Sequence, residues 1–151
     1  NGYVLCPGTY PGYGLGQCAT KATIEILARD NGAAYKHVWK LQEQLMDGML
    51  ACAEKYDIPL TITESQGVFS TIFGIPGGRR RLYTKEDLIG FDKKIVEVFQ
   101  QYLQDLGVFI MFGGRWYVNI SHSQEDIDKT LIAIDKAMKA MKENNMKYVQ
   151  E

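Results

Sequence analysis

The run Leu60-Thr61-Ile62-Thr63-Glu64-Ser65-Gln66-Gly67-Val68-Phe69-Ser70-Thr71-Ile72-Phe73-Gly74 decides the fold of this chain. Residues 60–64 alternate apolar and polar side chains, and residues 67–74 are rich in β-branched and aromatic ones, as half-buried strands are. Ser65-Gln66 joins the two runs, either as a hairpin or as a short crossing connection. The sequence therefore predicts two neighbouring strands here.

Two further strands are expected downstream, at residues 108–112 and 116–121, with Gly113-Gly114-Arg115 between them. We expect all four strands to share one sheet. Residues 75–83 are expected to form a polar loop, and three consecutive arginines in it, Arg79 to Arg81, are typical of a solvated segment.

Apolar residues at helical spacing predict two helices before this sheet, from about Leu15 to Asp30 and from about Ala33 to Tyr56. Asn31-Gly32 separates them, because both residue types tolerate a positive φ at a helix end.

Two more helices are expected among the strands. Each opens on a hydroxyl residue with a carboxylate three positions later, at Thr84 and at Ser123. The helix from Thr84 ends at Gly107, and residues 143–151 are polar and are expected to fray. The order of elements predicts an α+β fold: a small, mostly antiparallel sheet with helices packed on it.

The composition of the chain limits the classes of function that it can have. The chain has 151 residues, 46% of them hydrophobic, which allows one ordinary globular domain. A formal charge of −1 gives no electrostatic footprint for nucleic acid, and no apolar run has membrane-spanning length. We expect neither partner. The start lacks the pattern of a signal peptide, and it reads as mid-domain sequence, so the chain is processed or is a piece of something longer.

Cysteine and histidine usage points to no structural or catalytic chemistry. Cys6, Cys18 and Cys52 are odd in number and form no CxxC pair, which fits a reducing cytosol and a cytoplasmic protein. His37 has no ligand partner four residues on, and His122 is typical of a helix-entry histidine. We expect no metal site and no catalytic residue within this chain.

A glycine-rich loop opens the chain: Cys6-Pro7-Gly8-Thr9-Tyr10-Pro11-Gly12-Tyr13-Gly14-Leu15-Gly16. Such a loop lets backbone N–H groups and the Thr9 hydroxyl approach an anion near a helix N-terminus. Many Gly/Pro turns enter helices and bind nothing, so a bare turn is the alternative. A P-loop is the weakest reading, because no Lys-Ser/Thr pair follows the glycines.

The order of motifs resembles the C-terminal part of class III pyridoxal-phosphate aminotransferases, with the glutamate-1-semialdehyde aminomutase group as the nearest match. The motifs that carry the resemblance are Gly8-Thr9-Tyr10-Pro11-Gly12, the strand Gly67–Phe73, the stretch Phe99–His122 and the helix start Ser123-Gln124-Glu125-Asp126-Ile127. Together they cover nearly the whole chain.

The resemblance implies that residues 1–32 are the Gly-Thr loop and linking helix of a large domain. Residues 33–151 would then be the C-terminal small domain of a fold-type I enzyme. It further implies pyridoxal 5'-phosphate as cofactor, a small-molecule amino substrate, and a homodimer. Gly8 and Thr9 would bind the cofactor phosphate of the neighbouring subunit, through hydrogen bonds to a dianion.

The same resemblance places the Schiff-base lysine upstream of the Gly-Thr loop, so this chain alone is expected not to carry out transamination. Arg115 lies on a loop that is near the substrate entrance in similar enzymes, where its guanidinium could hold a substrate carboxylate. The alternative for Arg115 is a surface arginine beside a turn. The alternative for the whole chain is a non-catalytic α+β binding or regulatory module.

Overall fold

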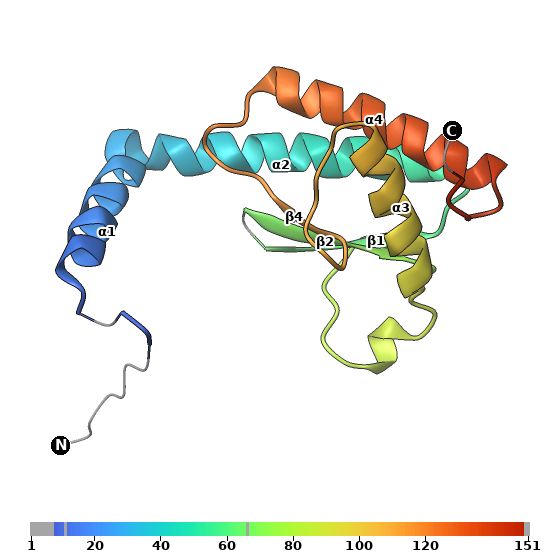
Figure 1. Ribbon diagram of the computed structural model, residues 1–151, viewed down its shortest axis with the longest axis horizontal. Helices are drawn as coiled ribbons and strands as arrows, with labels where there is room; N and C mark the ends of the chain where they lie inside the picture. The colour runs from blue at the N-terminus through green and yellow to red at the C-terminus, as the bar shows by residue number, and fades with distance from the viewer. Residues whose placement is uncertain (1–7, 11, 66, 150–151) are drawn as a thin grey trace. The chain divides into compact units, whose positions relative to one another are not determined.

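A computed structural model describes residues 8–10, 12–65 and 67–149 of the chain (Figure 1). It divides into two compact units, residues 1–36 and residues 37–151. The boundary between the two units falls within a single helix.

The first unit is built around α1, Gly14–Leu27, which buries none of its residues. Leu15 is 71% exposed and Ile24 is 60% exposed. A second helix, α2, spans Arg29–Lys55, but its backbone has positive φ at Asp30, Asn31 and Gly32. The chain therefore breaks where the Asn31-Gly32 stop is predicted, and the prediction is confirmed.

The second unit contains a four-stranded sheet in the order β3-β1-β2-β4. Strands β1, Leu60–Ser65, and β2, Val68–Phe73, form an antiparallel hairpin in which Leu60 faces Phe73. Strand β4, Arg115–Tyr117, pairs antiparallel with β2. The predicted α+β fold is confirmed, and the connection between the first two strands is a hairpin.

The sheet is mixed, which corrects the expectation of a mostly antiparallel one. The difference is β3, Gly78–Arg79, which pairs parallel with β1 inside the predicted polar loop. Arg79 Nη2 donates to the backbone oxygen of Glu43 at 3.0 Å and pairs with Asp47 Oδ1 at 2.5 Å, both on α2. The interpretation of Arg79 as solvated is therefore wrong, because these bonds hold it against the helix.

The strand predicted at residues 108–112 does not form. Only an isolated bridge joins Met111 to Arg115, and the Val108 N–H donates instead to the backbone oxygen of Leu103 at 2.8 Å. The strand predicted at 116–121 stops after Tyr117, because a turn follows in which the Ser121 N–H donates to Asn119 Oδ1.

The third long helix starts later than predicted. Helix α3, Lys93–Asp105, is capped by Asp92, whose carboxylate accepts from the backbone N–H groups of Lys94 and Ile95. The Thr84 signal is real, since Thr84 and Asp87 exchange hydrogen bonds, but it opens only the short 3-10 turn η1, Glu86–Leu88. Gly90, with φ +95°, then separates this turn from α3.

The last helix begins as predicted. Ser123 and Asp126 form a capping box at the start of α4, Gln124–Glu143. Figure 1 shows α2 and α4 running side by side. They approach closely: a Cβ at Gly48 would lie 2.4 Å from Leu131 Cδ2. Helices α2, α3 and α4 bury one face of the sheet, and the largest fully buried side chains are Phe69, Phe73, Phe99, Leu41, Met46, Met49, Ile62, Leu103, Ile134, Met138, Met141 and Val96.

The C-terminal tail is tied to α3, at least as far as Val149, where the expectation was a frayed end. The Tyr102 hydroxyl donates to the backbone oxygen of Lys147 and accepts from Asn144 Nδ2 and from the Val149 N–H, all at 3.0 Å. The Tyr148 hydroxyl donates to Asp105 Oδ2 at 2.7 Å, which raises the pKa of Tyr148. The Tyr102 hydroxyl thus provides hydrogen-bond partners for one carbonyl and two N–H groups of the tail.

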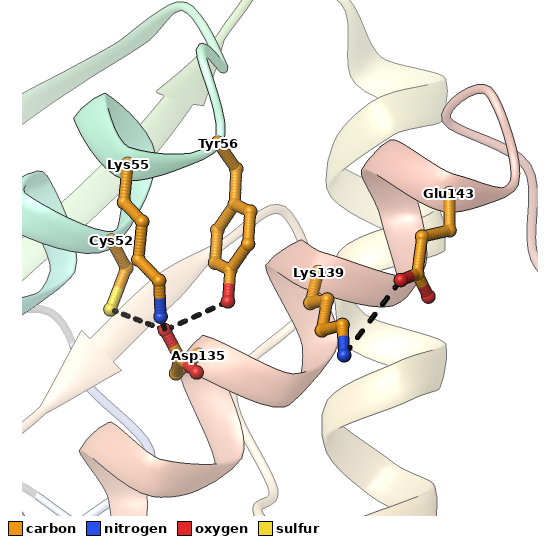
Figure 2. Close-up of polar contacts among 6 residues, drawn as sticks. All are labelled: Cys52, Lys55, Tyr56, Asp135, Lys139 and Glu143. Carbon is orange, nitrogen blue, oxygen red and sulfur yellow. Dashed lines mark hydrogen bonds and ion pairs between the residues drawn. The ribbon is translucent and has the colours of Figure 1, made fainter.

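A carboxylate on α4 joins that helix to the end of α2 (Figure 2). Asp135 Oδ1 accepts from Lys55 Nζ at 2.7 Å and from the Tyr56 hydroxyl at 3.1 Å, with Cys52 Sγ at 3.8 Å. The Lys55 hydrogen bond in particular holds the pKa of Asp135 below its ordinary value of 3.8. The pKa of Cys52 is raised, first by burial and then by the Asp135 charge.

We expect Tyr102→Phe to lower the free energy of unfolding by about 1–3 kcal/mol, because it removes three partly buried hydrogen bonds between α3 and the tail. Urea titration of the whole chain measures this. Tyr148→Phe is the matched control: it removes one exposed hydroxyl bond and should cost well under half as much. Equal costs would show that the Tyr102 hydroxyl does not organise the tail.

We expect Asp135→Asn to lower stability at neutral pH by up to about 1 kcal/mol, the usual worth of a partly exposed ion pair. Because the folded-state pKa of Asp135 is depressed, its contribution is present above the unfolded value of 3.8 and is lost as the pH falls through the folded one. The difference between wild type and variant should therefore shrink in acid. Glu143→Gln, in the exposed Lys139–Glu143 pair at 3.8 Å, is the control and should change little at any pH.

Candidate functional site

The glycine-rich loop lies directly before α1. Gly8 and Thr9 are exposed, and Pro11 lies outside the described residues. The Tyr13 N–H donates to the backbone oxygen of Tyr10 at 3.2 Å, and Gly12 has φ +76° in the turn that this bond closes. A positive φ here explains why the turn uses glycine.

The first backbone N–H groups of α1 are not capped by a side chain. Tyr13 occupies the N-cap and makes no side-chain cap hydrogen bond, and no acidic residue lies in the first turn. Within the described part of the chain, the Thr9 hydroxyl makes no hydrogen bond. Uncapped N–H groups at a helix start carry partial positive charge, so this region can receive an anion.

Arg115 is the first residue of β4, and not a loop residue as the sequence predicts. It is exposed, and among the described residues its guanidinium has no ion-pair partner. Its backbone is well fixed, because its carbonyl accepts from the Met111 N–H at 3.0 Å and its neighbour in β2 is Ser70. A fixed backbone with an unpaired guanidinium suits recognition of a carboxylate.

Thr71 sets the position of Arg115. The N–H and the hydroxyl of Thr71 both donate to the carbonyl of Gly114, at 3.0 and 3.1 Å. Thr71 is completely buried, and Gly114 has φ +75°. A Cβ on Gly114 would lie 2.7 Å from the Thr71 hydroxyl oxygen and 3.0 Å from its backbone oxygen. Only glycine therefore fits next to Arg115.

Arg115 also lines a cavity of about 550 Å³ in the second unit. The cavity lies between β4, the segment after α3 and the first turns of α4. Trp116 lines it too, and the sequence reasoning missed this residue: it is 5% exposed, and its indole Nε1–H has no partner among the described residues. The alternation of side chains along β4, which turns Trp116 inward next to Arg115, was the available signal.

The two histidines hold a turn together, as expected of structural histidines. His37 Nε2 lies 2.9 Å from the backbone oxygen of His122, so the proton of His37 is on Nε2, since a carbonyl can only accept. His122 Nδ1 accepts from the Asn119 N–H at 3.1 Å. This assigns the proton of neutral His122 to Nε2.

No three histidine, cysteine, aspartate or glutamate side chains of that part of the chain gather to hold a metal ion. No helix in the same residues is both long and apolar enough to cross a membrane.

Known proteins resemble this chain along nearly its whole length. A glutamate-1-semialdehyde 2,1-aminomutase from Methanococcus maripaludis is 29% identical over 144 residues, which are 93% of this chain and 32% of the relative. The chain is homologous to part of such aminomutases. The resemblance stated from the sequence is thereby confirmed. The chain spans about a third of the length of the curated relatives that it matches. No protein-family model matches it.

Solved structures share the fold. A variant glutamate-1-semialdehyde aminomutase from Pseudomonas aeruginosa, in complex with PMP, superimposes with a TM-score of 0.72 at 21% identity and covers 92% of this chain and 31% of its own. The PLP internal aldimine form of the FumI protein from Sphingopyxis sp. also gives 0.72, at 15% identity, covering 94% of this chain and 30% of its own. At these identities the matches establish the fold.

We expect Gly114→Ala to destabilise the chain by at least about 2 kcal/mol, because it adds both a positive-φ penalty and a clash with Thr71. Gly113→Ala is the matched control, with φ +80° but nothing within 4 Å of its Cβ, and should cost only about 1 kcal/mol. Chemical denaturation measures both. A Gly114→Ala variant no worse than Gly113→Ala would show that the Thr71 contact does not constrain this turn.

Proposed function

We propose that this chain is the C-terminal segment of a class III pyridoxal-phosphate-dependent aminotransferase or aminomutase, which transfers an amino group on an amino acid or amino ketone. The observation that carries the proposal is the match over more than nine-tenths of this chain to only a third of the aminomutases. The shared fold supports it. The proposal includes a cytoplasmic location, which the cysteine usage favours.

The residues at the glycine-rich loop fit a phosphate. Gly8 and Thr9 are exposed, the Thr9 hydroxyl has no partner among the described residues, and the start of α1 lacks a side-chain cap. Thr9 would donate to a phosphate oxygen of pyridoxal 5'-phosphate, and the Gly8 backbone would allow close approach. When bound, this cofactor would supply an electron sink for negative charge on the substrate carbon next to the amino group.

The environment of the lysines supports a Schiff-base lysine that lies in an upstream segment and not in this chain. All the lysines of the chain are exposed on helices or loops. A nucleophilic lysine needs a desolvated or cationic neighbourhood that lowers its pKa, and the hydrogen bond from Lys55 to Asp135 raises its pKa instead. The chain would thus contribute binding residues, while the Schiff-base lysine would come from upstream.

Arg115 would hold the substrate carboxylate. Its guanidinium has no competing ion pair in the described part of the chain, and the Thr71–Gly114 contact fixes where its side chain starts. A planar guanidinium binds a carboxylate through two parallel hydrogen bonds, which would orient the substrate as well as bind it.

The proposal includes a homodimer in which Thr9 reaches the partner subunit's phosphate site. Its support is α1, where Leu15, Ile24 and Ile26 are all exposed in a helix that buries nothing. Apolar side chains spaced along one short helix are typical of an element that packs against something else.

The test is Thr9→Ala in a longer protein that carries the upstream segment. Losing a hydrogen bond to a charged group costs about 1.5–3 kcal/mol, so affinity for pyridoxal phosphate should fall roughly ten- to hundredfold. Absorbance titration measures it. Thr9→Ser is the matched control: it retains the hydroxyl and should stay close to wild type.

Dilution of the wild-type dimer should weaken cofactor binding as well, if the contact crosses the interface. Unchanged affinity in Thr9→Ala would reduce Thr9 to a turn residue and remove the central element of the proposed site.

A further inference from the structure

The turn before β4 has an exposed face with an oxidisable side chain next to a cationic one. Met111 lies directly opposite Arg115 in an isolated antiparallel bridge, so the two side chains project from the same face of the paired segments. Both also line the cavity of about 550 Å³. Ile110 and Trp116, their neighbours in the chain, are buried, as the alternation of side chains along paired segments requires. The exposed face therefore places a thioether next to a guanidinium.

The backbone of Met111 is fixed by two hydrogen bonds. Its N–H donates to the Arg115 carbonyl at 3.0 Å, and its carbonyl accepts from Gln100 Nε2 at 3.0 Å. The backbone of Arg115 is fixed in turn by its pairing with Ser70 in β2. The Cβ atoms of directly opposite residues lie about 4.5–5.5 Å apart, which is within the reach of a methionine and an arginine side chain. The sulfur and the guanidinium can therefore meet as long as this turn is folded.

Met111 differs from the other methionines in its access to solvent. It is 48% exposed, whereas Met146 is partly buried against the core. The other four methionines are completely buried: Met46, Met49, Met138 and Met141. Oxidation of a thioether requires contact with the oxidant, so its rate follows exposure, and a buried methionine reacts only when the core opens. A peroxide in solution therefore reaches Met111 first.

Arg115 is the donor available to a new oxygen on Met111. Its guanidinium only donates hydrogen bonds, and it has no ion-pair partner among the described residues. Lys93, a second cation beside this turn, lies 3.4 Å from Glu97 and over the Phe112 ring. A thioether sulfur is a weak acceptor, whereas a sulfoxide is polar and its oxygen accepts readily. Oxidation thus creates an acceptor next to an unpaired donor.

We propose that Met111 is a peroxide-sensitive modification site whose sulfoxide oxygen accepts a hydrogen bond from the Arg115 guanidinium. The Met111 sulfur attacks one oxygen of the peroxide, so that an S–O bond forms while the O–O bond breaks. The sulfur loses two electrons and the peroxide gains them. The departing hydroxide takes the proton of the transferred hydroxyl and leaves as water. Methionine sulfoxide reductases restore the thioether, so the modification is reversible.

The first test is the order of oxidation. The whole chain is treated with dilute hydrogen peroxide under native conditions and digested, and the addition of oxygen to each methionine is measured by mass spectrometry. We expect Met111 to be oxidised before Met146, and at least about tenfold faster than the four completely buried methionines. The control is the same treatment in a urea concentration that unfolds the chain, where the six rates should become similar.

The second test observes the guanidinium. The chain, labelled with ¹⁵N in its arginines, is oxidised until Met111 alone has reacted, and the Nε–H resonances are followed by NMR. The resonance missing in Arg115→Lys belongs to Arg115, and Arg79, which α2 holds in place, is the internal reference. We expect the Arg115 resonance to shift and its proton to exchange more slowly with water, while the Arg79 resonance stays in place. Met111→Leu, which keeps an apolar side chain and has no sulfur, should show no shift after the same treatment.

The modification site is overturned if Met146 or a completely buried methionine reacts as fast as Met111 in the folded chain. The hydrogen bond is overturned if the Arg115 resonance stays in place when Met111 alone is oxidised, or if the shift persists in Met111→Leu. No cofactor, substrate or partner subunit takes part in this chemistry. Its failure is therefore distinguishable from failure of the Thr9 test, which reads cofactor affinity.

Discussion

The carbonyl of Gly114, bound twice by the buried Thr71, is the contact on which the rest of the second unit depends. It closes the turn between the segment after α3 and β4, and so determines where β4 joins β2. That registration places Trp116 on Phe69 and starts Arg115 at the sheet edge. A glycine is required because any Cβ there would meet Thr71. One backbone oxygen thus connects the aromatic core to the candidate site.

Local signals predicted most elements of the fold. The β1–β2 hairpin follows from alternation within a few residues, and the capping box at Ser123 from two side chains that satisfy each other's backbone. The same kind of signal misled at Thr84, where an equally good cap opens one short turn because Gly90 interrupts it before α3. Asp92 is a second candidate for the N-cap of α3. The choice between Thr84 and Asp92 depends on the hydrogen bond from the Asp92 N–H to the backbone oxygen of Phe73 in the sheet.

Contacts between residues that are distant in the sequence determine the features that local sequence patterns did not predict. Residues 108–112 are as apolar as a strand, yet Leu103 and Gln100 of α3 take the hydrogen bonds of Val108 and Met111. Arg79 lies in a run of arginines, yet α2 supplies it with Asp47 and a backbone oxygen. Gly8, Thr9 and Arg115 were named through resemblance to a family. The unpaired state of the Trp116 indole depends on surroundings that only the folded chain assembles.

The exposed apolar residues of α1 make the stability of this helix depend on what packs against it. A helix of 14 residues is close to the length below which isolated helices are marginal in water, and none of the residues that the structure describes covers Leu15 or Ile24. Whatever covers those side chains also stabilises the helix start beside Gly8 and Thr9. By linkage, an anion held at that start strengthens the association that orders it, by the same free energy with which association strengthens anion binding. The apparent affinity for the ligand would therefore depend on the concentration of the partner, and the apparent affinity for the partner on the concentration of the ligand.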